Sequence, residues 1–139
     1  MKQTTTINET FALDTNILVY LEGNDILKRK IAEDLLSLDP IIPSQVISEF
    51  MNVIRRLRKI SKLQLIAETA ELFRHCLIAP IEHSTLDLAK SLIQKYDFQI
   101  FDSIIVASSL EANCDILYSE DMQHNQIIEK NLVIKNPFV

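Results

Sequence analysis

Short apolar runs alternate along the chain with longer segments in which apolar residues recur every three or four positions. The short runs cover residues 10–13, 40–43, 78–81, 115–119 and 132–136. Continuous runs of this length are typical of strands buried in a parallel sheet. The longer segments predict helices over residues 17–21, 26–38, 44–60, 62–77, 84–96 and 102–114. This alternation predicts a single α/β domain, residues 1–139, with a central parallel sheet and helices on both faces.

Residues near the predicted helix and strand ends fit this assignment. Asp25 and Ser44 are suitable N-caps, and Pro80 makes the strand around it short or peripheral. The segment 102–114 is apolar nearly all round, so we expect a buried helix there. Two other helices are each expected to bury one apolar stripe. In the helix over residues 26–38 the stripe consists of Ile26, Leu27, Ile31, Leu35, Leu36 and Leu38. In the helix over residues 62–77 it consists of Leu63, Leu65, Ile66, Ala70, Leu72 and Phe73.

Glycine is nearly absent, since Gly23 is the only one in 139 residues. A loop that cradles phosphates with backbone N–H groups needs two or three glycines close together, so P-loop and dinucleotide-binding signatures are excluded. Phosphate chemistry would therefore have to use side chains or a metal ion. Asn is the next-best residue for a left-handed backbone, and Asn24, Asn113 and Asn125 stand where the chain must turn.

The remaining composition is that of an ordinary globular protein, with 47% hydrophobic residues, 24% charged residues and a net charge of −5. The first ten residues lack the apolar stretch of a signal peptide, and no apolar run approaches the ~20 residues of a membrane span. We therefore expect a cytoplasmic protein without a membrane segment. Cys76 and Cys114 lie far apart and the three histidines form no metal-binding pattern, which argues against a zinc site or a structural disulfide.

Four acidic residues fall where a parallel sheet would bring them together. Asp14 ends the first strand, Asp121 follows the fourth, and Asp102 opens the most apolar helix. Glu49 lies at the rim of the apolar face of the 44–60 helix. Ligands of open parallel sheets bind beyond the carboxyl ends of the strands, which is the edge where these acids are expected.

Each of these residues also has an ordinary structural explanation. Asp14 suits a turn, Asp102 a helix N-cap, Glu49 a solvated helix rim and Asp121 a loop. Together they are harder to explain, because converging carboxylates raise one another's pKa unless a cation lies among them. Oxygen ligands of this kind favour a hard divalent ion, Mg²⁺ or Mn²⁺.

Three segments carry a more specific pattern: FALDTNILVYL, then SQVISEFMNVI, then FDSIIVASSLEANCDILYSEDMQH. In this order they resemble the motif blocks of PIN-domain proteins, and especially of the VapC-like ribonuclease toxins of bacterial toxin–antitoxin pairs. The resemblance implies an α/β/α sandwich around a parallel sheet, a homodimer, RNA as substrate and a small cognate antitoxin. It also implies an acidic quartet with two supporting polar residues, namely Asp14, Glu49, Asp102 and Asp121 with Asn16 and Ser119.

The chain departs from the family pattern at a few positions. Asn113 and Asn125 stand where relatives often have Gly, and Ser103 stands where the family usually has Ala. Asn can preserve a left-handed helix end, so the geometry can survive. Glu120 and Asp121 lie in the same loop, and the sequence leaves open which of them is the fourth acid.

By this interpretation Asp14, Asp102 and Asp121 would hold the metal ion, which would lower the pKa of a bound water and polarise a phosphodiester oxygen. Glu49 would be a further ligand or a base that orients the water. In-line attack would then cleave the RNA strand.

A net charge of −5 is unfavourable for binding a polyanion, but the positive charge is concentrated in one stretch. Residues 55–62 carry five basic and no acidic residues, whereas residues 1–54 have a net charge of −4 and residues 63–139 of −6. A solvated helix end is the alternative explanation. With no Trp and few exposed aromatic candidates, base stacking has little support. The candidate RNA-binding residues are Arg55, Arg56, Arg58 and Lys59, with Lys28, Arg29 and Lys30 as a second group.

Two other functions remain open at this level. A phospho-accepting receiver domain also has an acidic Mg²⁺ site on a parallel sheet, but this chain lacks an adjacent acidic pair after its first strand. A non-catalytic PIN-like module would keep the acids and only bind RNA or a protein. The ordered acidic quartet favours a metal-dependent ribonuclease over both.

Overall fold

A six-stranded sheet forms the centre of the molecule in the computed structural model, which describes residues 9–139. The expected lack of a signal peptide concerns a segment that lies almost wholly outside these residues. In space the strands follow the order β3-β2-β1-β4-β6-β5, and every neighbouring pair is parallel except β5 and β6. The strands are β1 (Phe11–Leu13), β2 (Ile41–Pro43), β3 (Leu77–Ala79), β4 (Ile116–Tyr118), β5 (Ile127–Ile128) and β6 (Leu132–Lys135).

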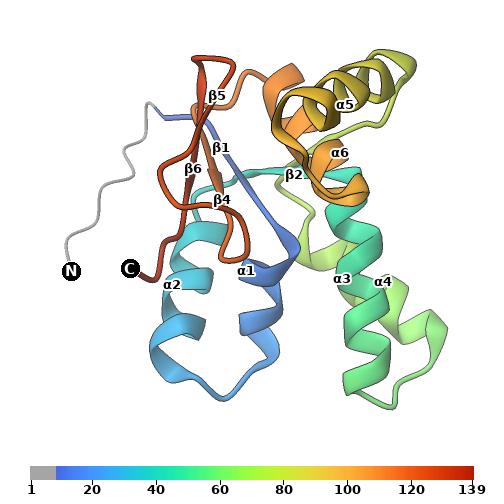
Figure 1. The fold of residues 1–139 in the computed structure, drawn as a ribbon. Coiled ribbons are helices and arrows are strands. Elements are labelled where there is room, and N and C mark those ends of the chain that lie inside the picture. The colour runs from blue at the N-terminus through green and yellow to red at the C-terminus, as the bar shows by residue number, and fades with distance from the viewer. Residues whose placement is uncertain (1–8) are drawn as a thin grey trace.

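Helices flank this sheet, which confirms the expected α/β/α architecture (Figure 1). Helices α5 and α6 pack against each other, and α3 contacts α1, α4 and α6. A short 3-10 helix, η1 (Tyr20–Glu22), extends α1. The α-helices are α1 (Thr15–Val19), α2 (Ile26–Leu36), α3 (Ser44–Leu57), α4 (Lys62–Leu72), α5 (His83–Tyr96) and α6 (Ile100–Glu111).

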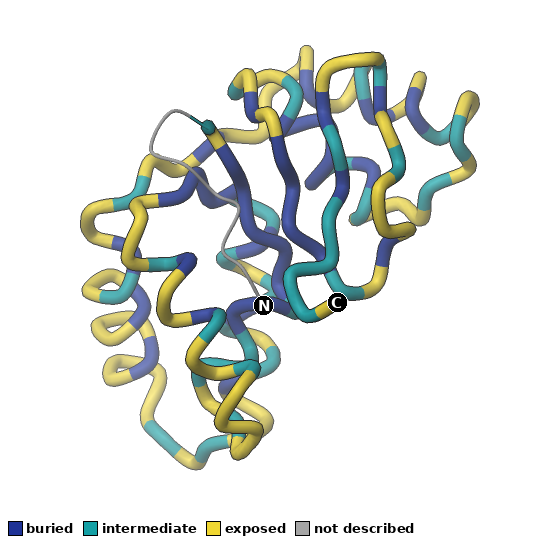
Figure 2. Tube along the Cα trace, turned by 90° about the vertical axis from the view of Figure 1, so that its left-hand side faces the viewer, coloured by how far each residue is buried: buried dark blue, intermediate teal, exposed yellow. Residues whose placement is uncertain are grey.

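The core lies along the central strands, where the chain is buried on both faces of the sheet (Figure 2). All three residues of β1, β2 and β4 are buried, as continuous apolar runs predict for parallel strands. Helix α3 buries Val46, Phe50 and Ile54, which are spaced by four residues and so lie on one side of the helix. Helix α6 is buried around much of its circumference, as its sequence predicts.

Two of the expected apolar stripes are wrong in detail. On α2 the buried residues are Ala32 and Leu35, whereas Ile26 and Leu27 are 81% and 77% exposed. Helix α2 runs along the outside of the domain, so only a narrow strip of its surface meets the core. The same holds for α4, where Leu65 is buried while Leu63, Ile66 and Ala70 are exposed.

Several element boundaries also differ from the expectation. Helix α4 ends at Leu72 rather than at residue 77, because Phe73 turns into the core and packs edge-on against Phe50. Ser44 is the first residue of α3 and not its N-cap; its hydroxyl donates to the carbonyl of Ala79 at 2.6 Å and so ties α3 to the end of β3. Asp25 does cap α2, since its carboxylate accepts from the Lys28 N–H.

Strand β5 was not expected from the sequence. Its two residues pair antiparallel with β6, with Ile127 opposite Val133 and Ile128 opposite Leu132. A pair of isoleucines is too short to show a strand period, and the pairing depends on the turn that follows, where Glu129 and Lys130 both have positive φ. Strand β3 lies at the other edge of the sheet, in agreement with the peripheral place that Pro80 indicates.

Residues other than glycine supply the left-handed backbone positions of this fold. Asn113 and Asn125 have φ of 60° and 67°, as expected, whereas Asn24 lies in a bend without a positive φ. Asn113 follows the C-terminus of α6, where its N–H donates to the Leu110 carbonyl. Further positive φ angles within residues 9–139 occur at Asp39, Asp97, Glu129 and Lys130.

No helix within residues 9–139 is both long enough and apolar enough to cross a lipid bilayer.

The left-handed helix end makes a testable prediction about stability. We expect Asn113→Val to lower the free energy of unfolding by about 1 kcal/mol or more, because a β-branched residue is strained at positive φ. That loss corresponds to a fall in Tm of roughly 3 °C or more. Asn113→Gly should be close to neutral, and Asn24→Val, in an exposed bend without positive φ, is the matched control. Thermal unfolding of the three variants measures the difference; equal Tm values for Asn113→Val and the unchanged protein would contradict it.

Candidate active site

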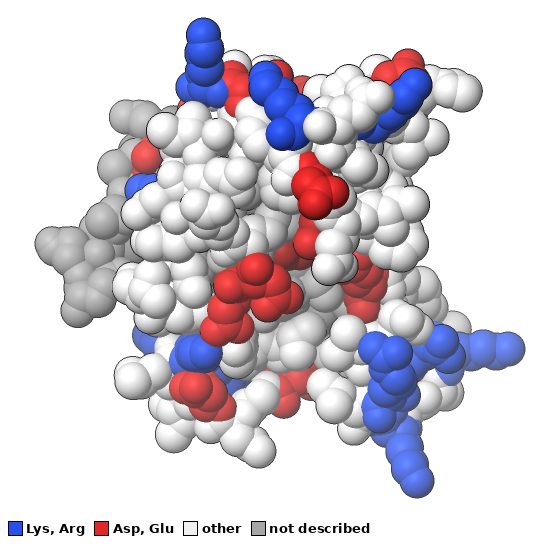
Figure 3. All heavy atoms as spheres, in the orientation of Figure 1, with Lys and Arg blue, Asp and Glu red and all other residues white. Residues whose placement is uncertain are grey.

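The four acidic residues expected to converge line a single pocket of about 450 Å³. It lies beyond the carboxyl ends of the neighbouring strands β1 and β4. This is the edge of an open parallel sheet where ligands bind. Figure 3 shows acidic side chains around a hollow in the middle of this face. The lining residues include Asp14, Glu49, Asp102 and Asp121, together with Thr15, Asn16, Tyr20 and Glu120.

Asp14 is the buried member of this group, with only 3% of its surface exposed. It follows β1 directly and forms the N-cap of α1, where its Oδ1 accepts from the Thr15 N–H at 2.7 Å. Its Oδ2 accepts from the Ser119 hydroxyl at 2.7 Å and from the Asn16 amide at 3.2 Å. The parallel register that places Leu13 opposite Tyr118 brings Asp14 and Ser119 together, so the sheet itself builds this contact.

The side chains of Asn16 and Ser119 therefore both donate to the Asp14 carboxylate. Asn16 also accepts, through Oδ1, from the Glu120 N–H at 3.0 Å. Ser119 accepts, through Oγ, from the Met122 N–H at 3.3 Å. These bonds hold the loop after β4 against the start of α1.

Burial raises the pKa of Asp14 to about 6, against the hydrogen bonds from Ser119 and Thr15, which lower it. The negative charges of Asp102 and Glu49 raise it further. Burial also raises the pKa of Asp102, and the charges of Glu49 and Asp121 add to this effect. The pocket thus concentrates negative charge that a cation would neutralise.

Glu49 projects from α3 toward α1 and is held by two neighbours. The Thr15 hydroxyl donates to its Oε1 at 2.7 Å, and the Gln45 amide donates to its Oε2 at 3.0 Å. Sequence reasoning did not single out Thr15 or Gln45. Gln45 lies four residues before Glu49 on the same helix, which is the spacing that brings two side chains together.

Asp102 lies in the first turn of α6 and not at its N-cap, which is Gln99. The neighbouring Ser103 is fully buried and its hydroxyl donates to the Ile100 carbonyl, so the departure from Ala at this position is absorbed within the helix. Asp102 is only partly buried, which leaves its carboxylate facing the pocket.

Glu120 and Asp121 have different surroundings. The Glu120 carboxylate accepts from Lys28 Nζ and from the Tyr20 hydroxyl, both at 2.6 Å. Although burial opposes it, these two bonds lower the pKa of Glu120. Asp121 is exposed, and its charge acts on Asp102. The Lys28–Glu120 pair was not expected from the sequence, because 92 residues separate the partners.

The basic stretch is divided by its contacts. Arg55 and Arg56 line a second groove that adjoins the acidic pocket. Arg58 forms ion pairs with Glu68 at 2.8 Å and with Glu22 at 3.7 Å, so its charge is already partnered. Lys59 is exposed after the end of α3, and Figure 3 shows Lys and Arg side chains gathered toward the lower right of this face. In the second group Lys28 pairs with Glu120, Arg29 with Glu33, and Lys30 with Asp34.

The donor chemistry of the pocket fits a hard divalent ion, because its acidic side chains offer oxygen ligands and Asp14 is buried with no ion pair to any residue between 9 and 139. As the side chains stand, however, no three His, Cys, Asp or Glu residues in the described part of the chain are close enough together to hold a metal ion. Binding would therefore have to draw the more exposed acids toward Asp14.

Fold and pocket together define an α/β protein with an acidic site at the carboxyl edge of a parallel sheet. A family model, described as PIN domain, matches residues 11–130. The chain belongs to the PIN-domain family. No curated protein matches it in sequence.

Solved structures with the same fold include toxins of toxin–antitoxin pairs. A toxin–antitoxin complex from Klebsiella pneumoniae has a TM-score of 0.69 at 20% identity, covering 92% of this chain and 98% of that one. VapBC2 from Rickettsia felis, bound to a fragment of promoter DNA, has a TM-score of 0.60 at 20% identity, covering 91% and 98%. Mycobacterium tuberculosis VapC20, a toxin that cleaves the sarcin–ricin loop, has a TM-score of 0.63 at 15% identity, covering 81% and 90%.

The raised pKa of Asp14 makes a prediction about stability and pH. A carboxyl group whose pKa rises from its ordinary 3.8 to about 6 on folding keeps its proton longer in the folded state. Its contribution to the free energy of unfolding is therefore greatest below about pH 4 and falls as the pH rises through 6, by up to ~3 kcal/mol.

Urea unfolding in EDTA between pH 4 and pH 7 measures this contribution. The stability of the unchanged protein relative to Asp14→Asn should fall across this range, and added Mn²⁺ should recover part of the loss. The exposed Asp87→Asn is the control and should follow the unchanged protein at every pH. A difference between Asp14→Asn and the unchanged protein that does not vary with pH would contradict the assignment.

Proposed function

We propose that this chain is a divalent-metal-dependent endoribonuclease, the toxin of a toxin–antitoxin pair. The observation that carries the proposal is one pocket of a PIN domain, at the carboxyl edge of its sheet, lined by Asp14, Glu49, Asp102 and Asp121. A receiver-like phospho-acceptor is disfavoured by the family to which the chain belongs. A non-catalytic PIN-like module is the remaining alternative.

Asp14, Asp102 and Asp121 would hold Mg²⁺ or Mn²⁺, which when bound would polarise a phosphodiester oxygen and make a water molecule more acidic. The hydrogen bonds from Ser119, Asn16 and Thr15 keep the Asp14 carboxylate in one orientation. Glu49 is held by Thr15 and Gln45, so it is positioned as a further ligand or as the base that orients the attacking water.

Of the two acids after β4, Asp121 is the better candidate for the fourth member of the quartet. Glu120 is committed to Lys28 and Tyr20, and freeing it would break an ion pair and a hydrogen bond. Asp121 is exposed beside Asp102 and needs no such exchange.

The partners of this protein are inferred from the relatives. The Klebsiella and Rickettsia structures contain a toxin together with its antitoxin. We infer a small antitoxin partner for this chain, most simply the product of an adjacent reading frame. Adding this antitoxin should suppress RNA cleavage. A homodimer stays a prediction that sedimentation of the purified chain would test.

The first prediction of this proposal concerns catalysis. Purified protein should cleave single-stranded RNA in Mn²⁺ and not in EDTA, and Asp14→Asn or Asp102→Asn should lower the rate roughly 100-fold or more. Asp87→Asn, a surface aspartate of α5, should cleave normally. Gel analysis of end-labelled RNA gives the rates. Equal cleavage by all four proteins would reveal a contaminating nuclease and refute the proposal, and Mn²⁺-independent RNA binding without cleavage would favour the non-catalytic module.

The second prediction separates the neighbouring acids. Asp121→Asn should reduce Mn²⁺-dependent cleavage by roughly tenfold or more, whereas Glu120→Gln should retain most of it, because the amide can still accept from Lys28 or Tyr20. Melting temperatures report whether either variant is merely less stable. The reverse order of activities would assign the fourth position to Glu120.

A further inference from the structure

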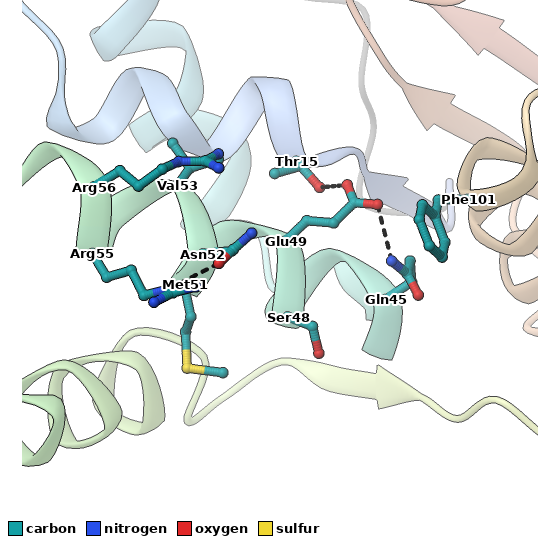
Figure 4. A pocket seen from close by; sticks show the side chains of 10 residues that line it. All are labelled: Thr15, Gln45, Ser48, Glu49, Met51, Asn52, Val53, Arg55, Arg56 and Phe101. Carbon is teal, nitrogen blue, oxygen red and sulfur yellow. Dashed lines mark hydrogen bonds between the residues drawn. The ribbon is translucent and has the colours of Figure 1, made fainter.

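A second groove, of about 700 Å³, continues from the acidic pocket along α3. The two share Thr15, Glu49 and Val53, so a ligand whose reacting bond lay at the carboxylates would extend directly into this groove. Its volume is within the range of ligand sites. Figure 4 shows its side chains, with Phe101 and Gln45 at one end and Arg55 and Arg56 at the other.

Phe101 is the unusual member of this lining. It lies next to Asp102 in the first turn of α6 and is 53% exposed, the only aromatic side chain among the large exposed hydrophobic residues of the described chain. Within residues 9–139 no other aromatic ring packs against it. The Phe101 ring is thus partly exposed to solvent in the groove that adjoins the acidic pocket.

The two arginines at the far end, Arg55 and Arg56, carry positive charges that no acidic residue of the described chain neutralises. Arg55 donates through Nε to Asn52 at 2.8 Å, which orients the guanidinium without neutralising it. In the described part of the chain neither Arg55 nor Arg56 forms an ion pair, unlike Arg58. Arg55 lies ten positions after Gln45 on the same helix, a distance of about 15 Å along the axis. This length suits a short stretch of nucleic acid strand.

We propose that this groove binds single-stranded RNA, with one base stacked on Phe101 and the backbone phosphates beyond it contacting Arg55 and Arg56. The inference rests on the proposed function for the identity of the substrate. A ring face beside a carboxylate pocket accepts the face of a base, and only an unpaired, unstacked base can reach it. The arrangement also explains how an acidic protein holds RNA next to its own carboxylates: an apolar stacking surface attracts the base without adding charge near the acids.

The test uses short single-stranded RNA with 2-aminopurine at successive positions, titrated with the full chain in EDTA so that no cleavage occurs. Phe101→Leu keeps an apolar side chain without a ring, and should weaken binding roughly 5- to 150-fold. Phe101→Trp should bind within about threefold of the unchanged protein, because it keeps a stacking face. Ile100→Ala is the matched control, since Ile100 is 63% exposed on the same turn and does not line the groove. The 2-aminopurine fluorescence should be quenched at one position, and Phe101→Leu should abolish that quenching.

Salt dependence separates the two kinds of contact. Arg55→Gln and Arg56→Gln should each reduce the slope of log affinity against log salt by about 0.7, whereas Phe101→Leu should lower affinity without changing the slope. An RNA that lacks the base at the quenched position should bind Phe101→Leu and the unchanged protein equally.

Several outcomes would overturn the inference. One is equal RNA affinity for Phe101→Leu, Ile100→Ala and the unchanged protein; another is a Phe101→Leu penalty that no abasic position removes. A changed sedimentation mass of Phe101→Leu with unchanged RNA binding would assign the ring to a protein contact instead. The proposed function is tested separately by cleavage in Mn²⁺. Phe101-dependent binding without cleavage would refute the nuclease alone, and cleavage with Phe101-independent binding would refute only this inference.

Discussion

The burial of one carboxylate, that of Asp14, is the constraint on which the site depends. Removing an ionisable group from water is costly, and the chain offsets this with donors from two directions: the Thr15 N–H and Asn16 amide from the start of α1, and the Ser119 hydroxyl from the end of β4. The β1–β4 register brings these donors together, and Thr15 in turn holds Glu49 on α3. The sheet, α1 and α3 therefore meet around the Asp14 carboxyl group. Its pKa remains raised to about 6. A cation bound beside this carboxylate would offset part of that cost, so we expect the chemistry of the site and its stability to be linked.

The distribution of charge follows from the same arrangement. The acids lie at the sheet edge, and the two arginines without an ion pair in the described chain lie further along α3, in the groove that adjoins them. The ion pair with Lys28 neutralises the charge of Glu120, so this residue adds little to the negative charge of the pocket. The Lys28 ammonium also lies over the rings of Tyr20 and Phe138. Ion pairs with Glu68 and Glu22 likewise neutralise the charge of Arg58 in the basic stretch. What remains is a change of charge along one surface, from the acidic pocket to Arg55 and Arg56, with Phe101 at the end of the groove opposite the arginines (Figure 4). This is a more specific description than the net charge of −5.

Much of the fold and part of the site could be predicted from the sequence, for physical reasons that differ between elements. Strands buried on both faces must be continuously apolar, so β1, β2 and β4 were evident. Asp14 was recognisable because a charged residue directly after such a strand marks its carboxyl end. The apolar stripe of α2 was right at Ile31, Leu35 and Leu36, which meet the core. It was wrong at Ile26 and Leu27, which have helical spacing although nothing in the described chain covers them. Strand β5 and the Lys28–Glu120 pair were missed, because each depends on partners that only the folded chain brings near.

The sequence by itself determined the order of the elements, the positions of the acids relative to the strand ends, and the left-handed turns at Asn113 and Asn125 in a chain with one glycine. These are local properties, set by side-chain type and by the periods of helix and strand. Only the tertiary structure decided which polar groups are partnered. Lys28 binds Glu120 and not Asp121, and Arg58 forms ion pairs whereas Arg55 and Arg56 form none in the described chain. It also decided that Phe101 faces a groove rather than the core. The physical reason is that partnership depends on distances between residues far apart in the chain, and these exist only once the sheet has set its register.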